Sequence, residues 1–380
     1  MTLLVSTKQE QAVQPQKLEY VDALRGLAIL GVIAVHSLLM FGSTQHLPAL
    51  FVNLVSNGAW GVRLFFIASA FTLFLSLHGR HKAERRPVLN FYLRRFFRIA
   101  PLYYLGILGY SAWAYFIGRT LYPPSKTLTE ALFLHGLTPS GMNSIVPGGW
   151  SITVEMMFYL LVPLLARAIT SLNRAVWFLL GTVLLHAALS WLFHRHPLTT
   201  DVDAWNLFLA WYLPKQLTVF ALGFIFYFLT RYPLPIRPGA LLAAALLGIL
   251  AFGAKASLAQ APASFALLPE DLGMSAALML FAWALSAYPF RFFVNRFTRR
   301  IGELSFSLYL IHFGVLYVLN WRGLIDFIAP TSTVRAAANY GVRFAVVLGI
   351  SCALAYLLHR FIEVWGQQVG RRVVAWLERR

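Results

Sequence analysis

Apolar segments of about twenty residues recur along the whole chain, and they constrain its fold more than any other feature. As a helix, a segment of this length spans the hydrocarbon core of a bilayer, which is about 30 Å thick. Only 12% of the 380 residues are charged, whereas soluble domains average about 25%. A helix also satisfies its own backbone hydrogen bonds inside lipid. The sequence therefore predicts an all-α, polytopic integral membrane protein built as a helical bundle.

We predict about ten transmembrane helices and no separate soluble domain. Their approximate ranges are 21–41, 58–77, 100–118, 150–167, 175–193, 213–230, 239–254, 272–289, 304–321 and 340–362. One transmembrane domain, residues 21–365, is expected between an N-terminal tail (1–20) and a basic C-terminal tail (366–380).

The formal net charge of +18 is explained by topology rather than by a nucleic-acid partner. With a cytoplasmic N-terminus, most Lys and Arg residues fall on the cytoplasmic side of the predicted spans, and this bias sets the orientation of membrane helices. Both termini are therefore expected in the cytoplasm. The one cysteine, Cys352, excludes a disulfide framework and a cysteine metal cluster, and no metal site is predicted.

The first apolar segment carries an arginine near its start and a histidine deep inside. Arg25 and His36 are eleven residues apart, so a helix places them on the same face and about 16 Å apart along its axis. A snorkelling arginine and a hydrogen-bonded histidine in the bundle would explain them structurally. Histidine is also the side chain best suited to exchanging a proton near neutral pH, so His36 is a candidate catalytic base.

An arginine cluster precedes the third segment, in LRRFFRIAPLYYL. Arg94, Arg95 and Arg98 would stand at its cytoplasmic end, because Pro101 suits the first turn of a helix. They are either an ordinary cytoplasmic flank or an anion site, since guanidinium groups bind phosphate oxygens in a bidentate manner.

The fourth segment, VPGGWSITVEMMFYLLVP, contains a carboxylate within a predicted span. Gly148 and Gly149 permit a tight turn before the helix. Ser151, Glu155 and Tyr159 follow at intervals of four, so they share one helical face. An unpaired carboxylate in a membrane is costly, which makes Glu155 a site candidate unless it forms a structural ion pair.

The ninth segment has a polar stripe formed by Ser305, Tyr309 and His312. His312 is expected at a depth similar to that of His36, where it is either a packing residue or part of a site. The second segment adds Ser69 and Arg63. His186 has no polar stripe around it and is expected to be structural.

These segments together resemble the membrane acyltransferase 3 family. The resemblance rests on six motifs that occur in order: Arg25 and His36 with ten residues between them; GVxLFFxxSxF with Ser69; RxxRIxP with Arg95 and Arg98; WSxxxExxFY from Trp150 to Tyr159; SxSLYLIH ending at His312; and FIE ending at Glu363. Ala70 departs from the usual glycine after Ser69 and Ala100 occupies a variable position. Neither change removes a polar group.

The resemblance implies transfer of an acyl group, usually acetyl, from cytosolic acyl-CoA to a hydroxyl of a carbohydrate or glycolipid acceptor at the bacterial inner membrane. It implies an essential His36, with Arg25, Arg94, Arg95 and Arg98 holding CoA. Glu155 is expected either to orient an imidazole or to bind the acceptor.

The remaining site residues are expected to bind substrate: Trp150 through its aromatic face to a sugar, Tyr309 and His312 through the thioester oxygen, and Ser69, Ser151 and Tyr159 through hydrogen bonds. The imidazole could act as a general base or accept the acyl group itself. A transporter with a buried His/Arg/Glu relay and a non-catalytic membrane subunit are the alternatives. The sequence indicates no role for Arg63 or Glu363 and no oligomeric state.

Overall fold

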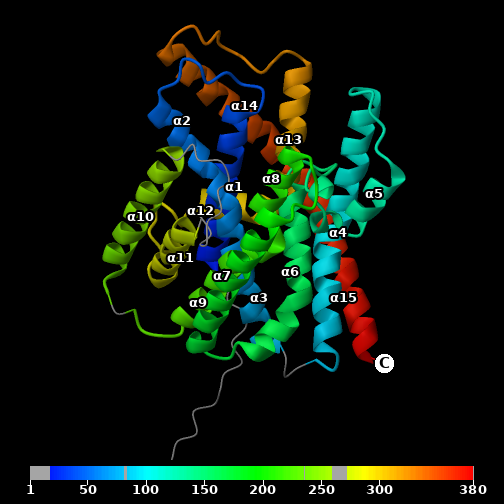
Figure 1. Ribbon diagram of the computed structural model, residues 1–380, viewed down its shortest axis with the longest axis vertical. Helices are drawn as coiled ribbons and strands as arrows, with labels where there is room; N and C mark the ends of the chain where they lie inside the picture. The colour runs from blue at the N-terminus through cyan, green and yellow to red at the C-terminus, as the bar shows by residue number, and fades with distance from the viewer. Residues whose placement is uncertain (1–17, 81–83, 235, 259–271, 380) are drawn as a thin grey trace, which may run out of the picture.

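A computed structural model shows a helical bundle with a C-terminal helix packed along one side (Figure 1). The structure describes residues 18–80, 84–234, 236–258 and 272–379. Most of the predicted N-terminal tail, together with Lys8, Lys17 and Lys82 of the basic segments, lies outside these ranges. Every regular element in the described part of the chain is helical, which confirms the predicted all-α class.

The elements follow one another through short connections. In the first half they are α1 (Glu19–Leu39), α2 (Ala49–Ser56), η1 (Asn57–Trp60), α3 (Gly61–Arg80), α4 (Pro87–Phe116), α5 (Pro124–Ala131), η2 (His135–Leu137), η3 (Pro139–Gly141) and α6 (Gly149–Ala168). In the second half they are α7 (Leu172–Arg195), α8 (Val202–Trp211), α9 (Leu213–Leu229), α10 (Pro238–Leu258), α11 (Leu272–Ala287), α12 (Arg296–Glu303), α13 (Ser305–Trp321), α14 (Thr333–Leu358), η4 (His359–Glu363) and α15 (Val364–Arg379).

Each of the ten predicted apolar segments coincides with a helix. By length and hydropathy, six helices of the described chain could cross a membrane, or seven if the bent pair α12–α13 is one span. The helices α10 and α11 are apolar but shorter, and α4 carries three arginines in its first half. The protein is therefore a polytopic membrane helical bundle.

The start of α4 differs from the prediction. The helix begins at Pro87, and Pro101 lies inside it. Pro87 supplies the first-turn proline, while Pro101 has no N–H to donate to the carbonyl one turn earlier. Gly366 of α15 packs directly on Phe97 O and the Pro101 ring. Arg95 and Arg98 are consequently well inside the helix rather than before it.

The central helix is α1, which packs against α3, α12, α13 and α14. Its contact with α12 is between backbones: a Cβ at Gly26 would lie 1.9 Å from Thr298 O, and one at Gly302 would lie 1.8 Å from Asp22 O. Only glycine permits so close an approach. This contact fixes α12 beside the part of α1 that carries Arg25.

Two irregular joints shape the C-terminal third. The helices α12 and α13 meet at an angle of 77°. The helices α14 and α15 are joined by the π-helical turn η4. The predicted C-terminal tail is mostly the helix α15, which lies alongside α4 (Figure 1).

Candidate active site

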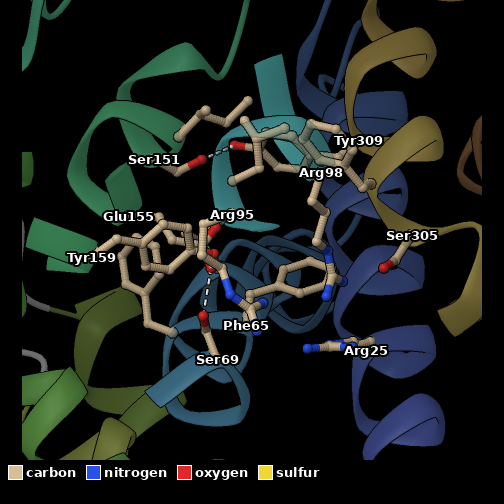
Figure 2. Close-up of a pocket in the computed structure, with 15 residues that line it drawn as sticks. Arg25, Phe65, Ser69, Arg95, Arg98, Ser151, Glu155, Tyr159, Ser305 and Tyr309 are labelled. Atoms are coloured by element: carbon tan, nitrogen blue, oxygen red, sulfur yellow. Dashed lines mark hydrogen bonds between the residues drawn. The ribbon is translucent and has the colours of Figure 1, made fainter. Parts of the chain in front are cut away.

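A cavity in the bundle brings together most of the predicted site residues. It holds about 700 Å³ of empty space, including solvent at its opening. We name it the arginine cavity, and Figure 2 shows its lining. Its polar lining residues come from α1, α3, α4, α6 and α13: Arg25, Ser69, Arg95, Arg98, Ser151, Glu155, Tyr159, Ser305 and Tyr309. The five family motifs that supply them are far apart in sequence, and the sixth, which ends at Glu363, does not line this cavity.

Three guanidinium groups converge on this cavity with little pairing to protein. In the described chain, none of Arg25, Arg95 and Arg98 forms an ion pair within 4 Å. Arg25 makes a long hydrogen bond, 3.4 Å, to Thr72 Oγ1, and Arg95 Nε is buried without a hydrogen-bond partner. Against these cations the lining offers one carboxylate, Glu155. The surplus of unsatisfied donors makes the cavity suited to an anionic ligand.

Glu155 is held by two hydroxyl groups rather than by a cation. Ser69 Oγ and Tyr159 OH both donate to its Oε1, the latter at 2.6 Å. Within the described residues, Oε2 accepts no hydrogen bond, so one carboxylate oxygen remains available. The Arg95 guanidinium lies 5.9 Å from the Tyr159 ring centroid. Within the described residues, Glu155 makes no hydrogen bond to an imidazole.

Tyr309, on the cavity wall, is held by the turn before α6. Gly148 has φ 77°, a left-handed conformation that glycine adopts without strain, and it starts α6. Its carbonyl accepts a hydrogen bond from Tyr309 OH at 3.1 Å, and Ser151 Oγ donates to the Tyr309 oxygen at 2.9 Å. The turn therefore fixes Tyr309 in place.

The two deep histidines form a pair behind this tyrosine. His36 Nδ1 lies 3.1 Å from His312 Nε2, and the His36 ring is 4.5 Å from that of Phe313. His312 is fully buried, and its ring centroid is 6.1 Å from that of Tyr309. Neither histidine is among the described residues that line the arginine cavity. Tyr309, which does line the cavity, is therefore the contact between the cavity and the pair.

The partners of the pair determine which ring nitrogens carry protons. His312 Nδ1 lies 3.0 Å from the carbonyl of Leu308, which can only accept. Neutral His312 therefore donates from Nδ1 and presents the lone pair of Nε2. That lone pair accepts from His36 Nδ1, and the other nitrogen of His36, Nε2, is left unprotonated. The arrangement orients His36 to accept a proton at Nε2.

Two predicted site residues lie elsewhere. Arg94 forms a bidentate ion pair with Glu84, at 2.8 and 3.1 Å, and does not line the arginine cavity. The Trp150 ring stacks on Trp211 with centroids 4.7 Å apart, so one of its two faces is covered by protein. His186 is buried beside Tyr212 and Ser190, consistent with a structural role.

A second cavity adjoins the first on the side of α12 and α15. We name it the vestibule. It shares Arg25, Arg98, Ser305 and Phe306 with the arginine cavity, and its other lining residues are Asp22, Gly302, Glu303, His359, Glu363 and Gln367. A third hollow, lined by Glu19, Asp22, Arg296, Arg299, Arg300 and Glu303, continues it along α12. Together the three cavities form a continuous polar path that runs along α12 and ends at the arginines.

The sequence analysis missed a buried cation near His36. Arg343 of α14 is 2% exposed and forms an ion pair with Asp326. Its Nε donates to Ile325 O at 2.6 Å, and its NH1 donates to Ser37 O at 3.1 Å. It ties the end of α1, next to His36, to the loop after α13. In the sequence, its only signal is the presence of an arginine inside a predicted apolar segment.

Comparison with known proteins decides the family. The acyltransferase domain of the acyltransferase 3 family matches residues 18–360, which cover the helices from α1 to η4.

The chain belongs to the acyltransferase 3 family. The resemblance drawn from the motifs is thereby confirmed, and this protein is a membrane acyltransferase at the level of its family. The chain is also similar to the acyltransferase MdmB of Streptomyces mycarofaciens, with 24% identity over 370 residues that cover 91% of each chain. No solved structure matches the chain.

Proposed function

We propose that this protein is an O-acyltransferase that transfers an acyl group, acetyl in the first instance, from cytosolic acyl-CoA to a hydroxyl of a carbohydrate-containing acceptor. The observation that carries the proposal is the arginine cavity. Three guanidinium groups without carboxylate partners face a space that also contains Glu155. A phosphorylated thioester supplies the negative charge that such a cavity lacks.

The proposed topology places the donor on the arginine side. Ten spans, α1, α3, α4, α6, α7, α9, α10, α11, α13 and α14, with both termini in the cytoplasm, put the vestibule toward the cytoplasm and the loop before α6 outside. This assignment is supported by the excess of Lys and Arg at the same ends of the spans. The membrane is accordingly the bacterial inner membrane.

His36 is the proposed base. The acceptor oxygen attacks the thioester carbonyl carbon and its proton passes to His36 Nε2; the C–S bond then breaks, and the leaving CoA thiolate takes that proton back from His36. The products are an ester and CoA thiol. Hydrogen bonding between His36 and His312 leaves Nε2 free for this step. The imidazole could equally accept the acyl group before the hydroxyl does, and both routes use the same nitrogen.

The chemistry requires the arginine cavity and the histidine pair to be joined. Tyr309 lines the arginine cavity and its ring centroid lies 6.1 Å from that of His312, so we propose that a shift of this side chain accompanies donor binding. Tyr309 would then exchange its hydrogen bond to Gly148 O for one to the thioester oxygen, where developing charge is stabilised. Glu155 and Ser151 are proposed to orient the ligand beside it.

The test is transfer of labelled acetyl from acetyl-CoA by the purified protein in lipid nanodiscs, with envelope glycans compared by mass spectrometry with and without the protein. We expect an acetyl increment on a glycan that disappears when the protein is absent. A protein that binds acetyl-CoA but never releases CoA in the presence of any glycan fraction would instead be a non-catalytic subunit, and the proposal would be wrong.

A further inference from the structure

We propose that Glu130 is a positioning residue of the acyltransferase site, which acts on Tyr309 through the turn before α6. This inference rests on the proposed function and extends it to a carboxylate outside the arginine cavity. Glu130 lies near the end of α5 and is fully buried. Within the described chain it forms no ion pair. A buried carboxylate without a cation has to be held by hydrogen bonds, and the donors of these bonds indicate its role.

Two consecutive backbone amides bind the carboxylate of Glu130. Its Oε2 accepts a hydrogen bond from Ile145 N at 2.7 Å, and its Oε1 accepts one from Val146 N at 2.9 Å. Tyr103 OH also donates to Oε1, at 3.0 Å. Hydrogen bonds to a carboxylate are about twice as strong as those between neutral groups. The loop before α6 is therefore fixed to α5 at two neighbouring points.

The fixed loop leads directly into the turn that holds Tyr309. Val146 O accepts a hydrogen bond from Gly149 N at 2.8 Å, which closes the turn. Gly148 O and Ser151 Oγ flank the start of α6, and they lie 3.1 and 2.9 Å from the Tyr309 oxygen. The position of Tyr309 therefore depends on the turn, and the position of the turn depends on the buried carboxylate.

A histidine of η2 contacts the same turn. His135 is 2% exposed, and its Nε2 lies 3.2 Å from Gly149 O. A carbonyl oxygen only accepts hydrogen bonds, so this nitrogen donates. The His135 ring stacks on that of Tyr103 with centroids 6.3 Å apart. Glu130, Tyr103 and His135 thus hold the turn from three different elements, and none of them is among the described residues that line the arginine cavity.

The turn matters for the reaction because it holds the Tyr309 oxygen. In the proposed reaction, the Tyr309 hydroxyl moves from Gly148 O to the thioester oxygen, while its own oxygen can still accept a hydrogen bond from Ser151 Oγ. A donor stabilises developing charge only when it is held within about 0.5 Å of the productive geometry. Loss of the Glu130 hydrogen bonds should therefore lower kcat. KM for acetyl-CoA should change little, because phosphate binding is assigned to the arginines.

The test is a double-mutant cycle between Glu130 and Tyr309, measured as kcat for acetyl transfer by the full-length protein in nanodiscs. Glu130→Gln places an amide NH2 against a backbone N–H, so one loop amide loses its acceptor. We expect kcat to fall about tenfold, the effect of roughly one charged hydrogen bond, with less than a twofold change in KM. In Tyr309→Phe, which has no hydroxyl to position, the same substitution should lower kcat less than twofold further, because residues that act through one another are not additive.

Glu378 provides a matched control. Its carboxylate also accepts hydrogen bonds from two consecutive backbone amides, Arg85 N at 2.9 Å and Arg86 N at 3.0 Å, but these bonds join the end of α15 to the start of α4. Glu378→Gln should therefore leave kcat within twofold of the unmodified protein. An equal or larger loss than in Glu130→Gln would mean that any such contact affects turnover, and the inference would be wrong.

The same cycle distinguishes positioning from stability. If Glu130→Gln lowers kcat by the same factor in both backgrounds, or leaves it unchanged, Glu130 only stabilises the fold, and the inference is wrong while the proposed transferase stands. Size-exclusion chromatography checks folding. Should Glu130→Gln not fold, Glu130→Asp keeps the charge and shortens the side chain by one methylene, and the same non-additive pattern is expected. If the unmodified protein transfers no acetyl to any glycan fraction, the proposed function is overturned and the inference with it.

Discussion

The arginine cavity and the histidine pair differ in the way their polar groups are satisfied. In the cavity, none of the three guanidinium groups forms an ion pair within the described chain, and Arg95 Nε is buried without a hydrogen-bond partner, as is typical of a site that awaits an anionic ligand. In the pair, His312 is fully buried and each ring is hydrogen-bonded to the other. The cavity is therefore suited to binding an anionic ligand, whereas the hydrogen bond within the histidine pair keeps His36 Nε2 unprotonated.

This difference indicates that the two ends of α1 have separate roles, ligand binding at one end and proton transfer at the other. Arg25 and His36 belong to the same helical face, about 16 Å apart along the axis, yet only Arg25 lines the cavity. In the proposed mechanism, a shift of Tyr309 would bring the thioester to His36. Substitutions in the two regions should consequently alter different kinetic constants.

The largest effect is expected for His36→Ala. Loss of the proton acceptor should reduce kcat by about 10²- to 10⁴-fold at saturating acetyl-CoA, with KM little changed. Steady-state transfer assays measure this directly, and size-exclusion chromatography checks that the variant is folded. Activity within tenfold of the unmodified protein would remove His36 from the mechanism.

Glu155→Gln should have the next largest effect, about 10- to 100-fold. The amide oxygen can still accept from Ser69 or Tyr159, so the local structure is kept while the charge is lost. The comparison of regions predicts that His36→Ala costs more than Glu155→Gln. If the order is reversed in the same assay, the base lies in the arginine cavity and the histidine pair is structural.

Arg95→Ala and Arg98→Ala should act on binding, raising KM for acetyl-CoA about tenfold or more each through the loss of a charged hydrogen bond to phosphate. Arg94→Ala is the matched control, because its guanidinium is paired with Glu84, and we expect less than a twofold change. Calorimetric titration with CoA measures the affinity. Equal effects at all three positions would mean that the arginines act only through membrane topology.

The smallest effect on turnover is expected for Arg343→Met. It removes the ion pair to Asp326 and the hydrogen bond to Ser37 O, which should lower the free energy of unfolding by about 1–3 kcal/mol. Thermal unfolding in detergent measures the loss. A kcat that falls as far as in His36→Ala, with stability unchanged, would show that Arg343 takes part in the reaction.

The sequence predicted the helices better than it predicted the site. Apolar length is a local property, so all ten segments were found, whereas the short polar helix α12 has no such signal. Glu155 and Tyr159 were paired correctly because they lie one turn apart on one helix. The partnership of His36 with His312 depends on packing between α1 and α13, and the stacking of Trp150 on Trp211 depends on α6 and α8. Neither contact can be predicted from the spacing of residues along a single helix.

The glycine contact between α1 and α12 limits how far these two helices can move relative to each other. Gly26 and Gly302 each lie against a carbonyl group of the opposite helix, so we expect the two helices to move as one rigid unit. Any side chain at either position would push the helices apart. Widening of the donor's route must then come from the opposite wall, at the π-helical turn and α15. Spectroscopic labels on α15 and α4 would report that opening, whereas labels on α1 and α12 would stay at a constant separation.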